Sequence, residues 1–143
     1  MIVYVDSSVL MRMVLQAPGS LREWPRIEHF VSSALLGVEC ARTIHRLHRL
    51  EPLSDDEFAR RWEALQRALA EFELVGLDPI VLDRASGPFA LPLKTLDAIH
   101  LTTAILWRER AQPTLRFATH DRQLGLAART SGFEVLGLHR GGS

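Results

Sequence analysis

The sequence predicts an α/β fold in which a mostly parallel sheet lies between layers of helices. Short apolar runs typical of buried strands alternate with longer segments whose apolar residues recur at helical spacing. This alternation favours βαβ units and therefore parallel strands. The 143 residues, 47% of them hydrophobic, suffice for one core. Because no repeat, low-complexity tract or linker divides them, a single domain is expected over residues 1–143.

The first elements follow from apolar runs and from the residues that punctuate them. Residues 1–5 form an apolar run that predicts a buried strand. Ser7 or Ser8 is expected to cap a short helix over residues 9–15. A second short strand is expected over residues 29–32.

Two longer helices are expected next. Ser33 is placed as the cap of a helix that runs to about Leu50, before Pro52. Ser54 and Glu57 have the spacing of a capping box, in which each side chain satisfies a backbone amide of the first turn. The helix that this box opens has an apolar face formed by Phe58, Trp62, Leu65 and Leu69.

The second half of the chain repeats the alternation of strands and helices. Asp78 and Pro79 are a typical start for a short helix, and the prolines after it indicate a loop. The remaining expected elements are strands over residues 74–77, 115–118 and 133–138 and helices over residues 95–109 and 121–131.

Composition limits the classes of function. The 17 basic and 17 acidic residues balance, which argues against a protein that coats nucleic acid through a positive field. Lys94 is the one lysine among the basic side chains, and the others are arginine. The lone Cys40 excludes an internal disulfide and fits a reducing compartment. Because no apolar run approaches the roughly 20 residues of a membrane span and no basic segment opens the chain, a cytoplasmic protein is expected.

Four carboxylates stand where this fold builds ligand sites. Asp6 and Asp121 come just after predicted strands, and parallel sheets bind ligands at those strand ends. Asp97 lies in the first turn of a helix, and Glu39 interrupts an otherwise apolar helical stretch. Acids that converge repel one another unless a cation neutralises them, and oxygen ligands suit Mg²⁺ or Mn²⁺.

Each acid also has a purely structural interpretation. Asp6 and Asp121 can cap helices, and Asp97 can favour the helix dipole. Glu39 can face solvent or pair with Arg42, three residues further on. No single acid therefore decides between the two interpretations.

Taken together, four segments resemble the motifs of the PIN-domain family in order and spacing. They are residues 3–10, which contain Asp6; residues 33–39, which end at Glu39; residues 96–104, which contain Asp97; and residues 117–121, which end at Asp121. The third segment is the most specific, and the resemblance extends from residue 1 to about residue 138. It implies a PIN-like α/β/α sandwich, and small chains of this kind are mostly VapC-like toxins.

The resemblance also implies a site and a reaction. Asp6, Glu39, Asp97 and Asp121 would form an acidic pocket for Mg²⁺ or Mn²⁺, with Ser8 and Thr119 as polar helpers near the metal or the scissile phosphate. The activity implied is cleavage of single-stranded or looped RNA, such as tRNA or rRNA loops, leaving a 5′ phosphate and a 3′ hydroxyl.

The implied partners are proteins as well as RNA. A VapB-like antitoxin would wrap the toxin and insert an arginine into the pocket, and a homodimer is expected. The region from Ser33 to Phe72, with Phe58, Trp62 and Leu65, is the expected antitoxin groove or dimer surface; the alternative is that these side chains are core.

Arginines near the acids are candidates for contacts with the RNA backbone. Three of them, Arg42, Arg46 and Arg49, share a helical face with Glu39. The other candidates are Arg12 and Arg122, and a solvated surface is the alternative for each. Trp24, in an expected loop, is the one aromatic candidate for stacking on a base.

Other side chains have weaker functional interpretations. His45 and His48 lack the further ligands of a zinc site, and Cys40 has the setting of a small core residue. His100 is expected to pack or hydrogen-bond beneath the site, and His120 is expected to be the more exposed. No GxSxG elbow or phosphate-binding glycine loop is present.

Three other functions are compatible with parts of the pattern. A non-catalytic PIN-like module that binds RNA or protein has no need for four mutually repelling acids. A phosphoacceptor receiver domain needs adjacent acids after its first strand, whereas Ser7 follows Asp6 here. A structure-specific DNA nuclease shares the metal chemistry but usually has additional DNA-binding elements.

Overall fold

Five parallel strands form one sheet in the computed structural model, which describes residues 1–111 and 114–138. The strand order is β3-β2-β1-β4-β5, and each neighbouring pair is parallel. The strands are β1 (Ile2–Val5), β2 (His29–Ser33), β3 (Phe72–Val75), β4 (Leu115–Ala118) and β5 (Val135–Leu136). The predicted α/β fold with a parallel sheet is therefore confirmed.

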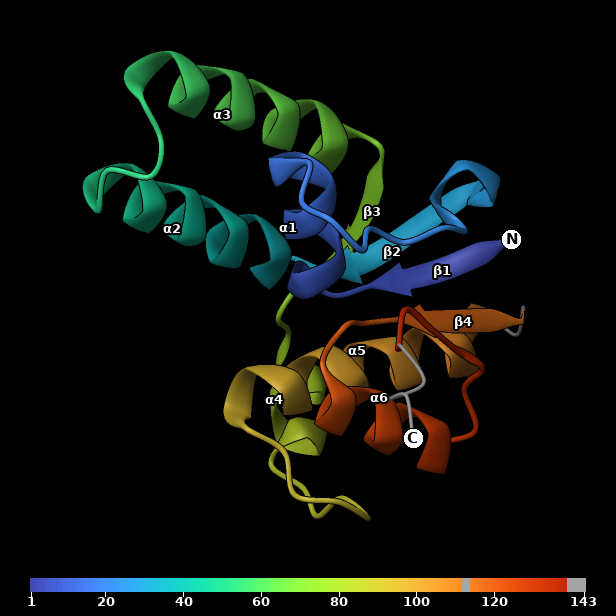
Figure 1. Cartoon of the computed structure of the whole chain (residues 1–143). Helices are drawn as coiled ribbons and strands as arrows, with labels where there is room; N and C mark the ends of the chain where they lie inside the picture. The colour runs from blue at the N-terminus through green and yellow to red at the C-terminus, as the bar shows by residue number, and fades with distance from the viewer. Residues whose placement is uncertain (112–113, 139–143) are drawn as a thin grey trace, which may run out of the picture.

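Helices cover both faces of the sheet (Figure 1). One layer contains α1, α2 and α3; in the other, α5 and α6 lie against the sheet and α4 packs on α5. The helices are α1 (Ser7–Leu15), α2 (Leu35–Arg49), α3 (Asp55–Ala70), α4 (Pro79–Ala85), α5 (Thr95–Ala111) and α6 (Arg122–Thr130), and a 3₁₀ turn spans Trp24–Arg26. No helix within these described ranges is both long and apolar enough to cross a membrane.

Alternation along β1 divides the buried side chains between the two layers. Val3 and Val5 belong to the core under α1, α2 and α3, whereas Tyr4 belongs to the core under α5 and α6. Successive strand residues point to opposite faces, so the apolar run at the start of the chain contributes to both cores. Tyr4 stacks on Phe117 of the neighbouring strand, with ring centroids 5.1 Å apart.

Two expected helix starts are wrong by one or two residues. Asp6, rather than Ser7 or Ser8, is the N-cap of α1, because its carboxylate accepts from the amides of Ser8 and Val9. Ser33 ends β2 and is not the N-cap of α2, which is Ala34. The Ser33 hydroxyl nevertheless accepts from the Leu35 amide.

The third strand covers residues 72–75, so the predicted range 74–77 is wrong. Its register pairs Phe72 with Phe30 of β2, and the two rings lie 5.1 Å apart between centroids. Packing of this partly buried aromatic pair places the strand two residues earlier than the apolar run alone indicated. Leu74 and Leu77 are exposed instead.

Local capping signals elsewhere are more reliable. Ser54 caps α3 through the Glu57 amide, and Asp78 caps α4 with Pro79 in the first helical position. Helix α5 runs two residues beyond the predicted end at residue 109. The last strand is shorter than the predicted range 133–138, since only Val135–Leu136 pairs with β4.

The connections leave β1 in two directions. The chain proceeds outward from β1 to β2 and β3, and then returns to the other side of β1 with β4 and β5. The reversal lies between β1 and β4, and crevices at such reversals are the preferred ligand sites of open parallel sheets. Asp6 follows β1 there, and Thr119 directly follows β4.

Helices α2 and α3 form a hairpin that extends beyond the carboxyl ends of the strands (Figure 1). Leu65 is fully buried inside it. Phe58 stacks on His48 at 4.4 Å and lies 5.8 Å from Trp62, measured between ring centroids. Leu65 is therefore core, which corrects its expected place in a partner groove, and Phe58 and Trp62 are partly buried between the helices.

Candidate acidic active site

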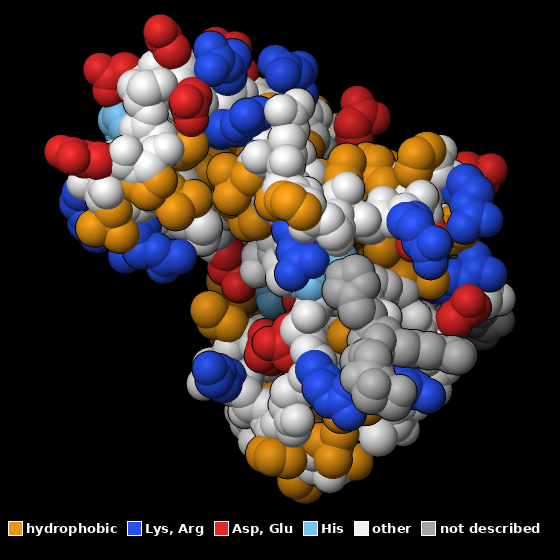
Figure 2. Space-filling view, viewed as in Figure 1, with side chains coloured by type: hydrophobic (Ala, Val, Ile, Leu, Met, Phe, Trp, Pro, Cys, Tyr) orange, Lys and Arg blue, Asp and Glu red, His pale blue; other side chains and the backbone are white. Residues whose placement is uncertain are grey.

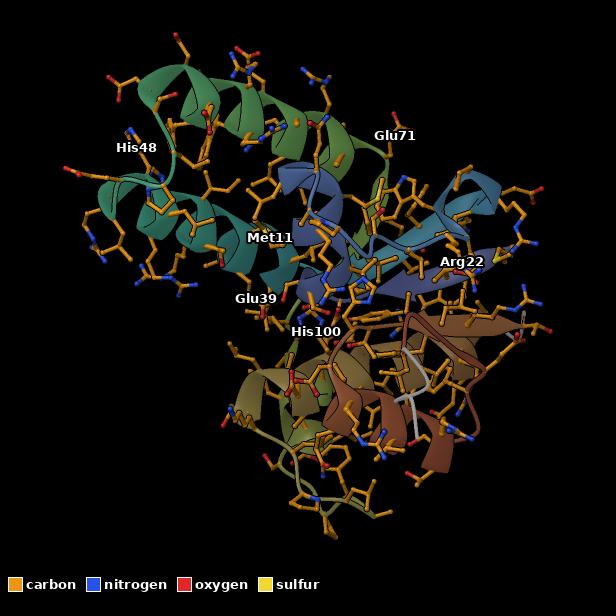
Figure 3. All side chains as sticks on the ribbon, in the orientation of Figure 1. Met11, Arg22, Glu39, His48, Glu71 and His100 are labelled. Atoms are coloured by element: carbon orange, nitrogen blue, oxygen red, sulfur yellow. The ribbon has the colours of Figure 1, made fainter. Side chains whose placement is uncertain are left out.

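The four predicted acids gather where β1 and β4 end, between the two helix layers. Asp6 follows β1, Glu39 belongs to α2, Asp97 to the first turn of α5, and Asp121 caps α6. Figure 3 shows Glu39 and His100 next to each other in this region. Segments distant in the sequence thus bring their acids to one end of the sheet.

Asp6 is held by hydrogen bonds to both of its carboxylate oxygens. Its Oδ1 accepts from the Ser8 hydroxyl at 2.6 Å and from the amides of Ser8 and Val9 at 3.1 and 3.3 Å. Its Oδ2 accepts from the Thr119 hydroxyl at 2.7 Å. The side chain is 4% exposed, and burial raises its pKa although these hydrogen bonds act in the opposite direction.

Ser8 and Thr119 also connect the two strand ends. The Ser8 hydroxyl accepts from the His120 amide at 2.9 Å, and the Thr119 hydroxyl accepts from the Asp121 amide at 3.0 Å. Each hydroxyl therefore donates to Asp6 and accepts from the segment after β4. The two predicted polar helpers lie against Asp6 and fix its orientation.

Asp97 shows that the acids influence one another. Burial raises its pKa, and the negative charges of Asp121, Asp6 and Glu39 raise it further, while His100 opposes them. Two of these acids are also linked by geometry, since the Thr119 hydroxyl donates to Asp6 and accepts from the Asp121 amide, and like charges close together disfavour the ionised form. Such a concentration of negative charge favours either a proton or a bound cation.

Asp97 and Asp121 line one side of an open hollow of about 480 Å³. Lys94 and Gln123 contribute to the same hollow. The Asp121 Oδ1 accepts from the Leu124 amide at 2.8 Å, which fixes that carboxylate as the N-cap of α6. A cationic and an amide side chain beside two acids are suited to contact an anionic substrate.

Glu39 is bound through both oxygens to side chains from other helices. Its Oε1 lies 2.6 Å from His100 Nε2, and its Oε2 accepts from the Ser7 hydroxyl at 3.3 Å. On the other side of the imidazole, His100 Nδ1 lies 2.7 Å from the Tyr4 hydroxyl. His100 is only 1% exposed, which confirms that it hydrogen-bonds beneath the site.

The donor set fits a small divalent cation. Within residues 1–111 and 114–138, no three His, Cys, Asp or Glu side chains are close enough to hold one ion directly. Mg²⁺ commonly takes only one or two carboxylates and keeps several waters. Asp97 and Asp121, which line one hollow, meet that requirement, and Asp6 and Glu39 would contact such an ion through water.

The arginines predicted to bind RNA have different environments. Arg42, Arg46 and Arg49 are exposed on α2, and Arg122 is exposed at the start of α6. Figure 2 shows basic side chains on α2 beside a recess where acidic side chains are visible. The remaining candidate, Arg12, is half-buried, and its guanidinium donates to the Gly19 carbonyl at 3.2 Å, so it connects α1 to the following loop.

Other candidate residues from the sequence make packing or hydrogen-bond contacts away from the four acids or beside them. Trp24 lies in the connection between α1 and β2, as expected, but its ring packs on Phe30 and Phe72 and is partly buried, which counts against stacking on a base. His48 Nε2 lies 2.8 Å from the Asp55 carboxylate at the tip of the α2–α3 hairpin. The remaining candidates are Cys40, which is buried, His45, which is exposed beside Phe58 and Trp62, and His120, which is half-buried with Nδ1 2.7 Å from the Gly137 carbonyl.

Three residues of this region are not predicted from the sequence. Ser7 is expected only as a helix cap and Tyr4 only as a strand residue, yet both hydroxyls belong to the hydrogen-bond network around Glu39 and His100. Lys94 is conspicuous in the sequence only for its rarity but lines the hollow beside Asp97. The sequence feature that could have identified two of them is their distance from the acids, since Ser7 follows Asp6 directly and Lys94 lies three residues before Asp97.

Comparisons with known proteins relate the chain to one family and one fold. The sequence profile of the PIN domain matches residues 3–128. A curated relative, Ribonuclease VapC46 of Mycobacterium tuberculosis, is 38% identical over 138 residues, which cover 94% of this chain and 95% of the relative. The crystal structure of PAE2754 from Pyrobaculum aerophilum is similar in fold, with a TM-score of 0.59, 17% identity, and coverage of 94% of this chain and 83% of that one.

Proposed function

The chain belongs to the PIN-domain family, and from this we propose that it is a metal-dependent endoribonuclease, the toxin of a type II toxin–antitoxin pair. The observation that carries the proposal is the convergence of four carboxylates at the sheet's reversal point, where three of them raise the pKa of the fourth, Asp97. The similarity of the chain to Ribonuclease VapC46, over nearly the whole of both proteins, supports the same assignment. The entire chain, residues 1–143, would act as one domain.

The proposed cofactor is Mg²⁺, or Mn²⁺ in its place. Asp6, Glu39, Asp97 and Asp121 would hold it, directly or through water. When bound, such an ion lowers the pKa of bound water and stabilises the charge on phosphate and leaving oxygens.

The side chains have separable tasks in this proposal. Asp97 or Asp121, on the open side of the site, accepts the proton of the attacking water. Ser8 and Thr119 hold the Asp6 carboxylate in one orientation through hydrogen bonds of 2.6 and 2.7 Å. Lys94 lies in the hollow beside both acceptors, where an ammonium can contact a phosphate oxygen.

The proposed substrate is single-stranded or looped RNA, with tRNA and rRNA loops as the candidate targets. Cleavage of either RNA inhibits translation. The exposed arginines of α2, Arg42, Arg46 and Arg49, together with Arg122, supply the backbone contacts. The proposed protein partners are a VapB-like antitoxin and a second copy of the chain, and the proposed location is the cytoplasm.

Cleavage of total cellular RNA by the purified protein tests the proposal. Wild type and Asp97→Asn are compared with Mg²⁺, with Mn²⁺ and with EDTA, and the fragment ends are sequenced. Asp56→Asn is the matched control, because Asp56 is an exposed acid in the first turn of α3, just as Asp97 lies in the first turn of α5.

The expected result is discrete fragments that require metal, persist in Asp56→Asn and decrease at least a hundredfold in Asp97→Asn. Intact RNA with all three proteins, in metal and without antitoxin, contradicts a nuclease. That result would favour a non-catalytic module that binds RNA or protein.

A further inference from the structure

A chain of short hydrogen bonds runs from the sheet to Glu39 through a buried histidine. The Tyr4 hydroxyl lies 2.7 Å from His100 Nδ1, and His100 Nε2 lies 2.6 Å from Glu39 Oε1. Tyr4 and His100 are 0% and 1% exposed, whereas Glu39 is 18% exposed at its side chain. Only the last member of the chain therefore reaches the solvent of the site.

The chemistry of Glu39 fixes which group donates to it. A carboxylate accepts hydrogen bonds and donates none, so His100 Nε2 must carry the proton that Glu39 accepts. When the ring is neutral, Nδ1 is an acceptor and the Tyr4 hydroxyl donates to it, whereas in a protonated ring Nδ1 donates to the Tyr4 oxygen. In either state Tyr4 holds the ring so that Nε2 presents a donor to Glu39.

The phenol is itself fixed in place. Its ring stacks on Phe117 with a 15° angle between the planes, and it meets the imidazole edge to face at 5.8 Å between centroids. Tyr4 belongs to the central strand β1, so the orientation of His100 is tied to the middle of the sheet. Helix α2, which carries Glu39, gains a direct connection to α5 through the same contact.

We propose that Tyr4 and His100 are positioning residues, which hold the Glu39 carboxylate in the orientation required to bind the divalent cation. Partners that hydrogen-bond to a metal's ligands commonly contribute 10- to 100-fold to metal affinity. Ser7, 3.3 Å from Glu39 Oε2, restrains the other oxygen. This proposal rests on the proposed function for the identity of the cation, and its test is chosen to be independent of RNA cleavage.

Two isosteric substitutions separate positioning from packing. In His100→Gln the side-chain amide approximates the place of Nε2, and in His100→Asn it approximates the place of Nδ1. Only the glutamine retains a donor toward Glu39. Thr103→Val is the matched control, because Thr103 is buried one turn further along α5 and its hydroxyl donates only to the Ile99 carbonyl of its own helix.

The measurement is Mn²⁺ affinity by isothermal titration, with circular dichroism to confirm that each variant is folded. We expect His100→Asn to bind Mn²⁺ at least 10-fold more weakly than wild type, and His100→Gln and Thr103→Val to remain within about threefold. Tyr4→Phe, which keeps the ring but loses the hydroxyl, should be intermediate. Equal affinity in the asparagine and glutamine variants, or no Mn²⁺ binding by wild type, overturns the proposal.

The tautomer supplies a second test that requires neither metal nor RNA. Long-range ¹H–¹⁵N correlation spectra of the wild type are expected to show His100 protonated at Nε2. A proton at Nδ1 alone would refute the proposed hydrogen bond from His100 to Glu39. If wild type binds Mn²⁺ in the predicted order of variants but leaves RNA intact, the positioning role stands and the proposed nuclease function fails. If RNA is cleaved while all variants bind Mn²⁺ equally, the proposed nuclease function stands and the positioning role fails.

Discussion

The Thr119 hydroxyl donates to the Asp6 carboxylate at 2.7 Å, which connects two residues 113 positions apart in the sequence. The same hydroxyl accepts from the Asp121 amide at 3.0 Å. Thr119 is fully buried, so water cannot replace either contact. This one side chain thus links the acid that follows β1 to the segment that follows β4.

Replacing Thr119 by valine should therefore destabilise the protein and reduce RNA cleavage together. The substitution preserves shape but leaves the Asp6 Oδ2 and the Asp121 amide without this partner, which typically costs about 1–3 kcal/mol. Urea unfolding measures the loss of stability. Thr119→Ser, which retains the hydroxyl, should recover most of both properties, and equal losses in the two variants would contradict this explanation.

The raised pKa of Asp97 predicts how stability depends on pH without metal. A carboxyl group with a raised pKa in the folded protein binds its proton more tightly there than in the unfolded chain. The free energy of unfolding therefore increases as the pH falls through the raised pKa, and the gain is complete below the ordinary value of 3.8. Above the raised pKa, the ionised group is a net cost to stability.

Comparison with Asp97→Asn isolates this effect from the other acids. Without metal, the difference in free energy of unfolding, variant minus wild type, should decrease as the pH falls from 7 to 4. Because Asp97 is only partly buried, solvent screening limits the change to about 1 kcal/mol or less. Urea unfolding at several pH values in EDTA measures it, and a difference that increases toward low pH would reverse the assigned sign.

The exposed arginines of α2 should contribute to RNA affinity through charge. Arg46→Ala is expected to weaken binding of single-stranded RNA and to reduce the slope of log affinity against log salt by about 0.7. Binding is measured in an Asp97→Asn background, which prevents cleavage. Arg60→Ala, at an exposed position on α3, is the control, and an equal loss in both variants would indicate a nonspecific effect of net charge.

The core assignment of Leu65 has a consequence for stability. Leu65 is fully buried within the α2–α3 hairpin, so Leu65→Ala should cost roughly 2–5 kcal/mol through lost burial and the cavity left behind. Val38→Ala is the comparison, since Val38 is 58% exposed on α2 and should change stability by no more than about 0.5 kcal/mol. Urea unfolding distinguishes the two, and similar values would place Leu65 outside the core.

The layers and the four acids are predictable from the sequence because both depend on local patterns. Apolar runs and helical periodicity determine which segments are strands and helices, and parallel strands bring their ends to one edge. The amino-acid order alone therefore suffices to place Asp6 and Asp121 at the same edge of the sheet, whereas the adjacency of β1 and β4 is known only from the structure. The predicted caps Ser54 and Asp78 are correct for the same reason, since each acts within its own first turn.

Features that depend on distant contacts cannot be derived in this way. The start of β3 is fixed by the packing of Phe72 on Phe30, which the apolar run at residues 74–77 does not indicate. Arg12 is within reach of the site by sequence but donates to the Gly19 carbonyl. The Tyr4 hydroxyl finds its partner, His100, 96 residues away, and no spacing rule links a strand residue to a helix that far along the chain.

Asp6 and Asp121 each perform two tasks, because both carboxylates are also the N-caps of the helices that follow them. A copy of this gene that had lost its activity would still be under pressure to retain these two aspartates, since their removal weakens the fold. Glu39 is also tied to the fold, because it accepts from the buried His100. Within the described part of the chain Asp97 has no such structural contact, so a copy released from catalysis would be free to lose it first. Among diverged copies, the state of position 97 is therefore the better diagnostic of whether the protein is still a working enzyme.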